Sequence, residues 1–265
     1  MQKIKQQPII NITPKQQEIL TLLYKFRFLN RIQIQSLLHH KDKKTINTWL
    51  KDLNEKNYIE RIYSSNFGEN TKPAIYYIGQ NGINFLKTQD DCSKSQVREL
   101  YRESERSENF ISKSIFLAEI YLYLRDQSND KKSFEVFTYV DINNPNSIFQ
   151  TLNELCPQFV FNKKEGFLNK YFLLEILDIN IPVYSVKKRL KKYLDYYFQN
   201  TWEDNIGGSF PVILIICMTK SQLISAKRLA RKLLSDYQNP EDFHIRFAIA
   251  EEVKKYGTTS EIWEV

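Results

Sequence analysis

The order of apolar segments after residue 103 constrains the fold of this 265-residue chain more than any other feature. An amphipathic pattern predicts a long helix over 103–126, and three strand-like runs follow before helical and strand-like segments alternate. The run at 171–179 is almost entirely apolar, which is typical of a central strand. This alternation predicts a mixed sheet flanked by helices. The expected strands are 134–140, 157–161, 171–179, 211–218 and 245–253, and the expected later helices are 186–198 and 225–237.

The first ninety residues show a different pattern, which is mainly helical. Thr13 and Pro14 form an N-cap and a helix opener, and apolar residues then recur at helical spacing as far as Phe26. A polar turn from Ser64 to Lys72 separates two short apolar runs, which predicts a β-hairpin. Further helices are expected at 31–38 and 43–57, strands at 58–63 and 74–78, and a closing helix around Ile83, Phe85 and Leu86. We therefore predict a first domain over 10–89, a polar surface linker over 90–103 and a second domain over 104–265.

The basic residues are distributed unevenly along the chain, which has a net charge of +7. Residues 1–89 contain 14 Lys and Arg against 6 Asp and Glu, a balance of +8. Residues 90–265 contain 24 against 25, a balance of −1. A domain that neutralises phosphates needs such an excess, so the distribution favours nucleic-acid binding by the first domain.

The third predicted helix, 43–57, has two chemically distinct faces. Its apolar face, expected to lie in the core, contains Ile46, Trp49, Leu50 and Leu53. Its other face carries side chains that bind phosphates and base edges, namely Lys43, Lys44, Asn47, Thr48 and Lys51.

The helices, the hairpin and the sequence LKDLNEKNYIERI at 50–62 resemble a winged helix-turn-helix domain. The resemblance implies that the third helix enters the major groove of double-stranded DNA and that the wing, with Lys72, contacts the flanking backbone. Winged helices also bind proteins, and the residues leave that alternative open.

The second domain carries two short motifs, PQF at 157–159 and LLEILD at 173–178. With the element order, they resemble the PD-(D/E)xK, or restriction-endonuclease-like, nuclease core. The whole arrangement over 10–255 resembles the replication-relaxation family of plasmids and integrative conjugative elements. The resemblance implies an α/β fold, in which an α+β winged helix precedes a mixed-sheet α/β domain. It also implies a role in plasmid replication or in relaxing plasmid DNA at an origin.

The departures from the nuclease motif bear on catalysis. A two-carboxylate site holds Mg²⁺ through charged oxygen ligands, but Gln158 stands where the motif has its first acid. Glu175 matches the second acid, whereas Leu177 replaces the motif's lysine. Asp178, three residues from Glu175 on the same strand, faces the opposite side of the sheet. The sequence therefore favours a nuclease-like domain that has lost cleavage and needs no cofactor, and a Mg²⁺-dependent endonuclease using Glu175 is the alternative.

The basic helix at 186–198 has two interpretations that the sequence does not separate. Lys187, Lys188 and Lys191 either form a second DNA surface or belong to an ordinary solvated face. Glu175 is then either a remnant of the nuclease site or a structural acid beside this helix.

Several protein classes are disfavoured by composition. The three cysteines (Cys92, Cys156, Cys217) are widely separated and the histidines are three, which argues against a disulfide framework, a thiolate zinc site or a histidine-rich relaxase site. The longest apolar run, 211–218, is far shorter than the roughly 20 residues of a membrane span. We expect a cytoplasmic DNA-binding protein without a membrane partner, acting with a replication initiator or a relaxase, with homodimerisation possible in principle. A transcription regulator with an effector or dimerisation domain is a further alternative.

Overall fold

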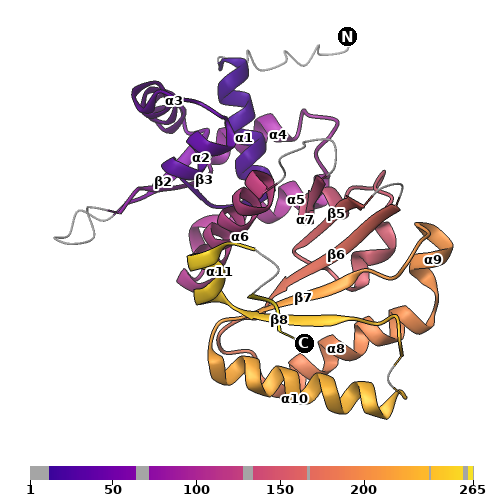
Figure 1. Ribbon diagram of the computed structural model, residues 1–265. Helices are drawn as coiled ribbons and strands as arrows, with labels where there is room; N and C mark the ends of the chain where they lie inside the picture. The colour runs from indigo at the N-terminus through magenta and orange to yellow at the C-terminus, as the bar shows by residue number, and fades with distance from the viewer. Residues whose placement is uncertain are drawn as a thin grey trace, which may run out of the picture. The chain divides into compact units, whose positions relative to one another are not determined.

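The computed structural model describes residues 12–63, 72–127, 134–165, 168–238, 240–258 and 262–264 (Figure 1). The chain divides into two compact units, Met1–Ile115 (unit 1) and Phe116–Val265 (unit 2). The division falls within one helix, α6 (Glu108–Gln127). The architecture is mixed α/β, as predicted, with a three-stranded antiparallel sheet in unit 1 and a five-stranded mixed sheet in unit 2.

Unit 1 contains the predicted helices and hairpin strands. They are α1 (Pro14–Phe26), β1 (Leu29–Asn30), α2 (Arg31–Leu37), α3 (Lys43–Glu55), β2 (Ile59–Ile62), β3 (Ile75–Ile78) and α4 (Gln80–Leu86). The sheet order is β1-β3-β2, and Ile59 pairs with Ile78 in the antiparallel hairpin. This sequence of elements is the one expected for a winged helix-turn-helix. The tip of the predicted wing, 64–71, lies outside the described residues.

Sequence signals set the starts of the first two helices. The Thr13 side chain accepts a hydrogen bond from the Gln16 amide, and the Gln16 side chain accepts one from the Thr13 amide, which makes a capping box. Asn30 and Gln33 form the same arrangement at the start of α2. Each cap satisfies backbone donors that have no partner within the helix.

The segment 90–103, predicted as a polar surface linker that becomes helical, is instead folded into unit 1. It forms α5 (Lys94–Glu99) and the start of a 3₁₀ helix, η1 (Leu100–Glu105). Val97 and Leu100, three residues apart, are almost fully buried in unit 1. Glu103 is also buried and forms an ion pair with Arg27. The prediction failed because two apolar residues among many charges are enough to bury one side of a short helix.

Several predicted boundaries are wrong, and two of them show the reasons. The helix expected from residue 103 is interrupted, because Arg106 is extended and α6 begins at Glu108. The strand expected over 245–253 ends at Ile249 as β8 (Ile245–Ile249), and α11 (Ala250–Tyr256) follows. Ala250 and Val253 are both buried, and a spacing of three fits one face of a helix as well as it fits a run of apolar residues. The short helices α7 (Tyr139–Ile142), η2 (Gln150–Glu154) and α9 (Thr201–Asn205) were not predicted.

The sheet of unit 2 has the order β4-β5-β6-β7-β8. Its strands are β4 (Phe134–Thr138), β5 (Phe159–Glu165), β6 (Leu168–Ile176), β7 (Val212–Cys217) and β8. The first three strands are antiparallel, and β6, β7 and β8 are parallel. The parallel strands are joined through α8 (Val183–Phe198) and α10 (Lys220–Asp236). Strand β6 is central, as the apolar run predicts.

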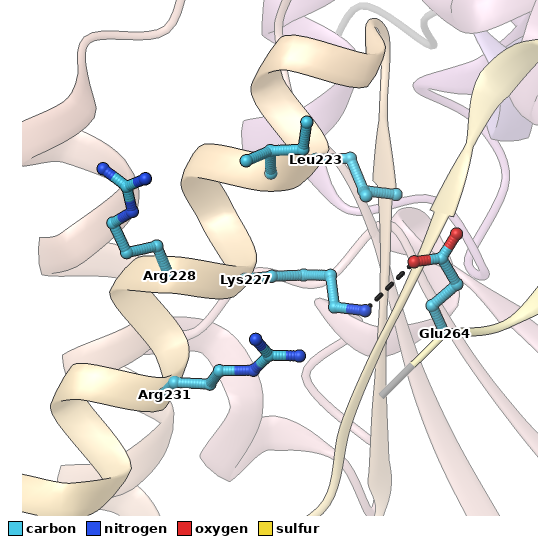
Figure 2. Close-up of a pocket in the computed structure, with 6 residues that line it drawn as sticks. Leu223, Lys227, Arg228, Arg231 and Glu264 are labelled. Carbon is cyan, nitrogen blue, oxygen red and sulfur yellow. Dashed lines mark hydrogen bonds and ion pairs between the residues drawn. The ribbon is translucent and has the colours of Figure 1, made fainter.

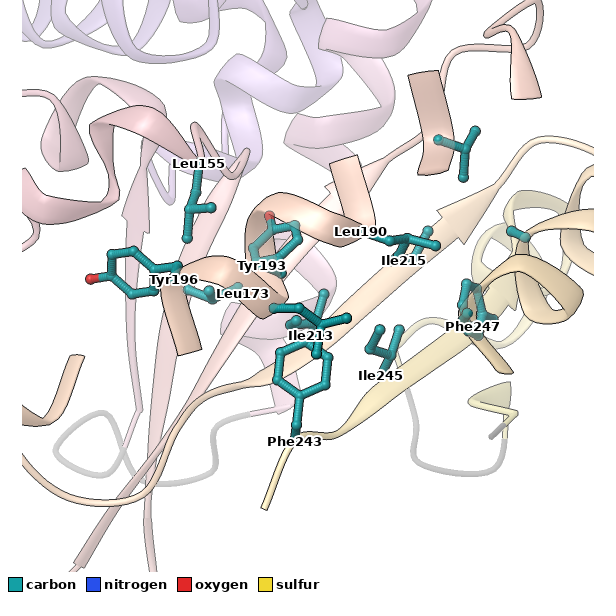
Figure 3. Packing of buried hydrophobic residues seen from close by; sticks show 14 of the residues in the cluster. Leu155, Leu173, Leu190, Tyr193, Tyr196, Ile213, Ile215, Phe243, Ile245 and Phe247 are labelled. Atoms are coloured by element: carbon teal, nitrogen blue, oxygen red, sulfur yellow. The ribbon is translucent and has the colours of Figure 1, made fainter. Parts of the chain in front are cut away.

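The helices α8 and α10 pack against each other and against one face of this sheet (Figures 1 and 3). Both belong to crossovers between parallel strands that advance in one direction across the sheet, and right-handed crossovers of this kind lie on one side. The core between them is apolar: Figure 3 shows Leu190 and Tyr193 of α8 close to Leu173, Ile213 and Ile215 of the sheet. Glu175 lies two residues beyond Leu173 on β6, so it points into the same layer.

Candidate functional site

The start of α3 is determined by Asp42. Its carboxylate accepts hydrogen bonds from the Thr45 hydroxyl at 2.5 Å and from the backbone amides of Lys44 and Thr45 at 2.9 and 3.0 Å. These bonds, that of the Thr45 hydroxyl above all, lower the pKa of Asp42. The first turn of α3 contains no acidic residue, so the capping Asp42 is the acidic group at this end of the helix. Within the helix, this end of the solvent face carries only cations and small polar groups, and the exposed carboxylate of Asp42 lies just before it.

The two faces of α3 are those that the sequence predicts. Ile46, Leu50 and Leu53 are buried in unit 1. All the predicted contact residues of the opposite face are exposed: Lys43, Lys44, Asn47, Thr48 and Lys51. The Thr48 hydroxyl donates to the Lys44 carbonyl at 3.0 Å, and Lys51 lies 3.7 Å from Glu55 across one helical turn. An exposed pair of this kind contributes little stability, so Lys51 is available for an external anion.

Side chains on the edge of α3 hold the helix in place. Asp52 accepts a hydrogen bond from the Gln16 side-chain amide of α1 at 2.7 Å and pairs with Lys56 at 2.9 Å. Trp49, expected in the core, is only half-buried and packs edge-on against the His40 ring, with centroids 5.1 Å apart. The indole therefore borders the solvent face of α3.

The hairpin adds cations beside the predicted wing. Lys72 is exposed, as predicted, at the start of the chain segment that leads into β3. Arg61 of β2 is also exposed, and its guanidinium lies 5.4 Å from the ring centroid of Tyr63. The sequence did not single out Arg61, because it lies two residues from buried Ile59 and strand alternation predicts an inward side chain. Strand β2 lies at the sheet edge, and Ile59 is the buried residue among its four.

In unit 2, Glu175 is a buried acid, and both of its carboxylate oxygens accept hydrogen bonds. The Glu175 side chain is only 2% exposed. The Arg189 Nε donates to both carboxylate oxygens at 2.6 and 2.8 Å, and the Tyr193 hydroxyl donates to Oε1 at 2.6 Å. Arg189 also donates to the Cys156 carbonyl at 3.0 Å. The acid on β6 is thus bound to two residues one helical turn apart on α8.

Glu175 raises the pKa of both side chains that donate to it, Arg189 and Tyr193. Burial lowers the pKa of Arg189, but the hydrogen bond and the charge of Glu175 outweigh that effect and raise the pKa above its ordinary value. Burial raises the pKa of Tyr193, and the neighbouring carboxylate adds to the increase. At neutral pH the arginine is therefore charged and the phenol is protonated, so both act as donors to Glu175.

Gln158 lies beside Glu175 in the sheet. Because Phe159 pairs with Leu174 in the antiparallel register, Gln158 lies opposite Glu175 across the two strands. Its side-chain oxygen accepts a hydrogen bond from the Ile176 amide at 2.8 Å. The fold thus brings the two nuclease-motif positions together, and both side chains hold local structure.

These residues do not fit a magnesium site. Mg²⁺ needs carboxylate oxygens that are open to it, but both oxygens of Glu175 face donors and the oxygen of Gln158 is bonded to the backbone. Leu177, at the position of the motif's lysine, is buried, and Asp178 is exposed. Within the described ranges, no group of three or more His, Cys, Asp or Glu side chains is arranged to hold a metal ion.

The cations of α8 lie in two different environments. Arg189 turns inward to Glu175, whereas Lys187, Lys188 and Lys191 are exposed on α8. The predicted α8 lysines and those of α3 belong to different units of the chain.

Fold and site together define a two-unit α/β protein with a basic, mainly helical unit and a buried, arginine-paired acid in a mixed-sheet unit. The chain belongs to the replication-relaxation family, whose sequence profile matches residues 20–213. No curated protein matches the chain. Among the helices of the described residues, none combines the length and the apolar character of a membrane span.

Two solved structures of the restriction endonuclease FokI show a weak overall similarity. One is 10% identical with a TM-score of 0.32, and it covers 94% of this chain and 45% of FokI. The other, FokI bound to DNA, is 12% identical with a TM-score of 0.28, and it covers 93% and 45%. This chain spans less than half the length of FokI, and similarity at this level supports no inference about its activity.

Proposed function

We propose that this protein binds double-stranded DNA through α3 and the β2–β3 hairpin. In this proposal it acts in the replication or relaxation of a plasmid or an integrative conjugative element, as an accessory to a replication initiator or a relaxase. Membership of the replication-relaxation family supports the process. The positive balance of residues 1–89 supports a polyanionic partner.

The observation that carries the proposal is the composition of the exposed face of α3. The exposed side chains of Lys43, Lys44 and Lys51 can contact phosphates, and those of Asn47 and Thr48 can hydrogen-bond to base edges. Acidic residues on this face would repel DNA, but Glu55 lies at its far end beside Lys51, and Asp52 at its edge is paired with Lys56. Arg61 and Lys72 extend the positive surface onto the hairpin.

A double charge reversal tests this surface. Lys44→Glu with Lys51→Glu should weaken binding of a labelled origin duplex at least tenfold, and it should reduce the slope of log Kd against log salt by about 2, because two phosphate contacts are lost. Binding is followed by fluorescence anisotropy at several salt concentrations. The matched control is Lys94→Glu with Arg98→Glu, which makes the same charge change at exposed positions of α5. Equal affinities for both double variants would remove α3 from the proposal.

We further propose that unit 2 does not cleave DNA through Glu175, because its carboxylate is committed to Arg189 and Tyr193. Purified protein is titrated onto supercoiled plasmid carrying the element's origin, in EDTA or Mg²⁺, and gels are run before and after protein removal. A mobility shift that disappears on deproteinisation is expected. Metal-dependent conversion to open circles that survives deproteinisation and is lost in Glu175→Gln would establish the nuclease instead.

A further inference from the structure

The net charge of unit 2 conceals a strongly polarised surface. Residues 116–265 contain 19 Lys and Arg and 19 Asp and Glu, so the unit is neutral in total. The two helices α8 and α10 alone contain ten Lys and Arg against two Asp and Glu. Because these helices pack side by side on one face of the sheet, their cations are gathered into one layer.

Most of these cations face solvent. Arg189 pairs with Glu175, and Lys227 pairs with Glu264 at 3.0 Å. The other eight are exposed: Lys187, Lys188, Lys191, Lys192, Lys220, Arg228, Arg231 and Lys232. We call these eight residues, which lie around the exposed sides of α8 and α10, the α8–α10 face. Holding so many like charges together is unfavourable unless a polyanion neutralises them.

Apolar groups lie among these charges. Tyr184 is 73% exposed, and Lys187, Lys188 and Lys191 follow it at spacings of three, four and seven, so all four share one side of α8. On α10, Ile224 is 52% exposed. It lines a shallow pocket together with Leu223, Lys227, Arg228, Arg231 and Glu264. Figure 2 shows Arg231 extending on the same side of α10 as Lys227, and Arg228 on the other side.

From this placement we infer that the α8–α10 face binds single-stranded DNA, with the lysines and arginines on the phosphates and Tyr184 stacked on a base. Two helices side by side, with axes about 8–10 Å apart, form a broad surface. A major groove about 12 Å wide admits only one helix, so the face does not suit groove recognition of a duplex. An exposed aromatic ring among cations fits unpaired bases, whose faces are accessible. The choice of a nucleic acid rests on the proposed function, whereas the surface itself belongs to unit 2 alone.

The test uses the full chain and a labelled oligo(dT) of about 20 nucleotides, longer than typical single-strand site sizes. The variant Lys187→Glu, Lys188→Glu, Lys191→Glu should bind it at least tenfold more weakly, with a salt slope smaller by about 2, since about 0.7 is lost per phosphate contact. Tyr184→Ala should weaken binding about tenfold without changing the salt slope, because it removes stacking and no charge. The matched control is Lys163→Glu, Lys164→Glu, Lys170→Glu, which reverses three exposed charges on β5 and β6.

This design tests the two proposed DNA-binding surfaces separately. The α8 triple variant should keep the origin-duplex affinity, and the Lys44→Glu, Lys51→Glu variant should keep the oligo(dT) affinity. Loss of duplex binding only in the α3 variant, with loss of oligo(dT) binding only in the α8 variants, supports both proposals. Oligo(dT) affinity that is absent in the unmodified protein, unchanged in the α8 triple variant or equally reduced in the control overturns this inference and leaves the α3 proposal standing.

Discussion

Replacing Arg189 by Met isolates the energetic role of the buried acid in unit 2. Met keeps an unbranched apolar stem of similar reach but removes the guanidinium, so Glu175 loses the donors at 2.6 and 2.8 Å and keeps only the Tyr193 hydroxyl. The carboxylate is 2% exposed, so water does not replace the lost partner. A buried charge left in this way typically destabilises a fold by about 3–5 kcal/mol. We therefore expect Arg189→Met to lower the free energy of unfolding by about 3–5 kcal/mol at pH 7.

Urea unfolding followed by tryptophan emission measures this difference, with the midpoint and slope giving the free energy. Trp202 is buried in the core of unit 2, and a Trp49→Phe background removes the tryptophan of unit 1. Emission then reports on unit 2, which separates its unfolding from that of unit 1.

Two further variants complete the test. Lys188→Met removes an exposed cation next in sequence and should change stability by less than about 0.5 kcal/mol. The double variant Glu175→Gln, Arg189→Met leaves no unpaired charge, so it should recover most of the stability lost by Arg189→Met. A loss below about 1 kcal/mol at pH 7, or a double variant no more stable than Arg189→Met, would refute the view that the pair is a buried, charge-compensated unit.

Two predictions concern unit 1. Asp42→Ala removes the cap of α3. Hydrogen bonds, first that of the Thr45 hydroxyl, lower the pKa of Asp42 in the folded protein. The stabilisation by the cap is therefore present above the unfolded pKa of about 4 and is lost as the pH falls through the lower folded pKa. Thermal unfolding should show a destabilised variant at pH 7 and a smaller difference from the unmodified protein near pH 3, and a difference that grows at low pH would contradict the cap. Gly82→Ala places a Cβ 2.2 Å from the Tyr58 carbonyl oxygen, so α4 must shift and the protein should lose about 1–3 kcal/mol of stability, whereas Asn84→Ala, at an exposed position of the same helix, should lose little.

Local patterns in the sequence predicted most of the elements correctly. Caps such as Thr13 and apolar spacing act within a few residues, so α1, α3 and the hairpin strands could be located from the chain alone. The exposed face of α3 was predictable for the same reason, because helical periodicity separates it from the buried one. The patterns failed where one spacing suits two structures, as at 250–253, and where few apolar residues are buried among charges, as at 94–103.

The sequence by itself thus determined the element order, the mixed α/β class and the basic face of α3, since each depends on neighbours in the chain. Only the tertiary structure decided the partner of Glu175, because Arg189 lies 14 residues away on a different element and reaches it through the packing of α8 on β6. It also decided the charge layer of unit 2. A count along the chain averages the cations of α8 and α10 with acids elsewhere, but two crossovers of the same hand place both helices on one face of the sheet.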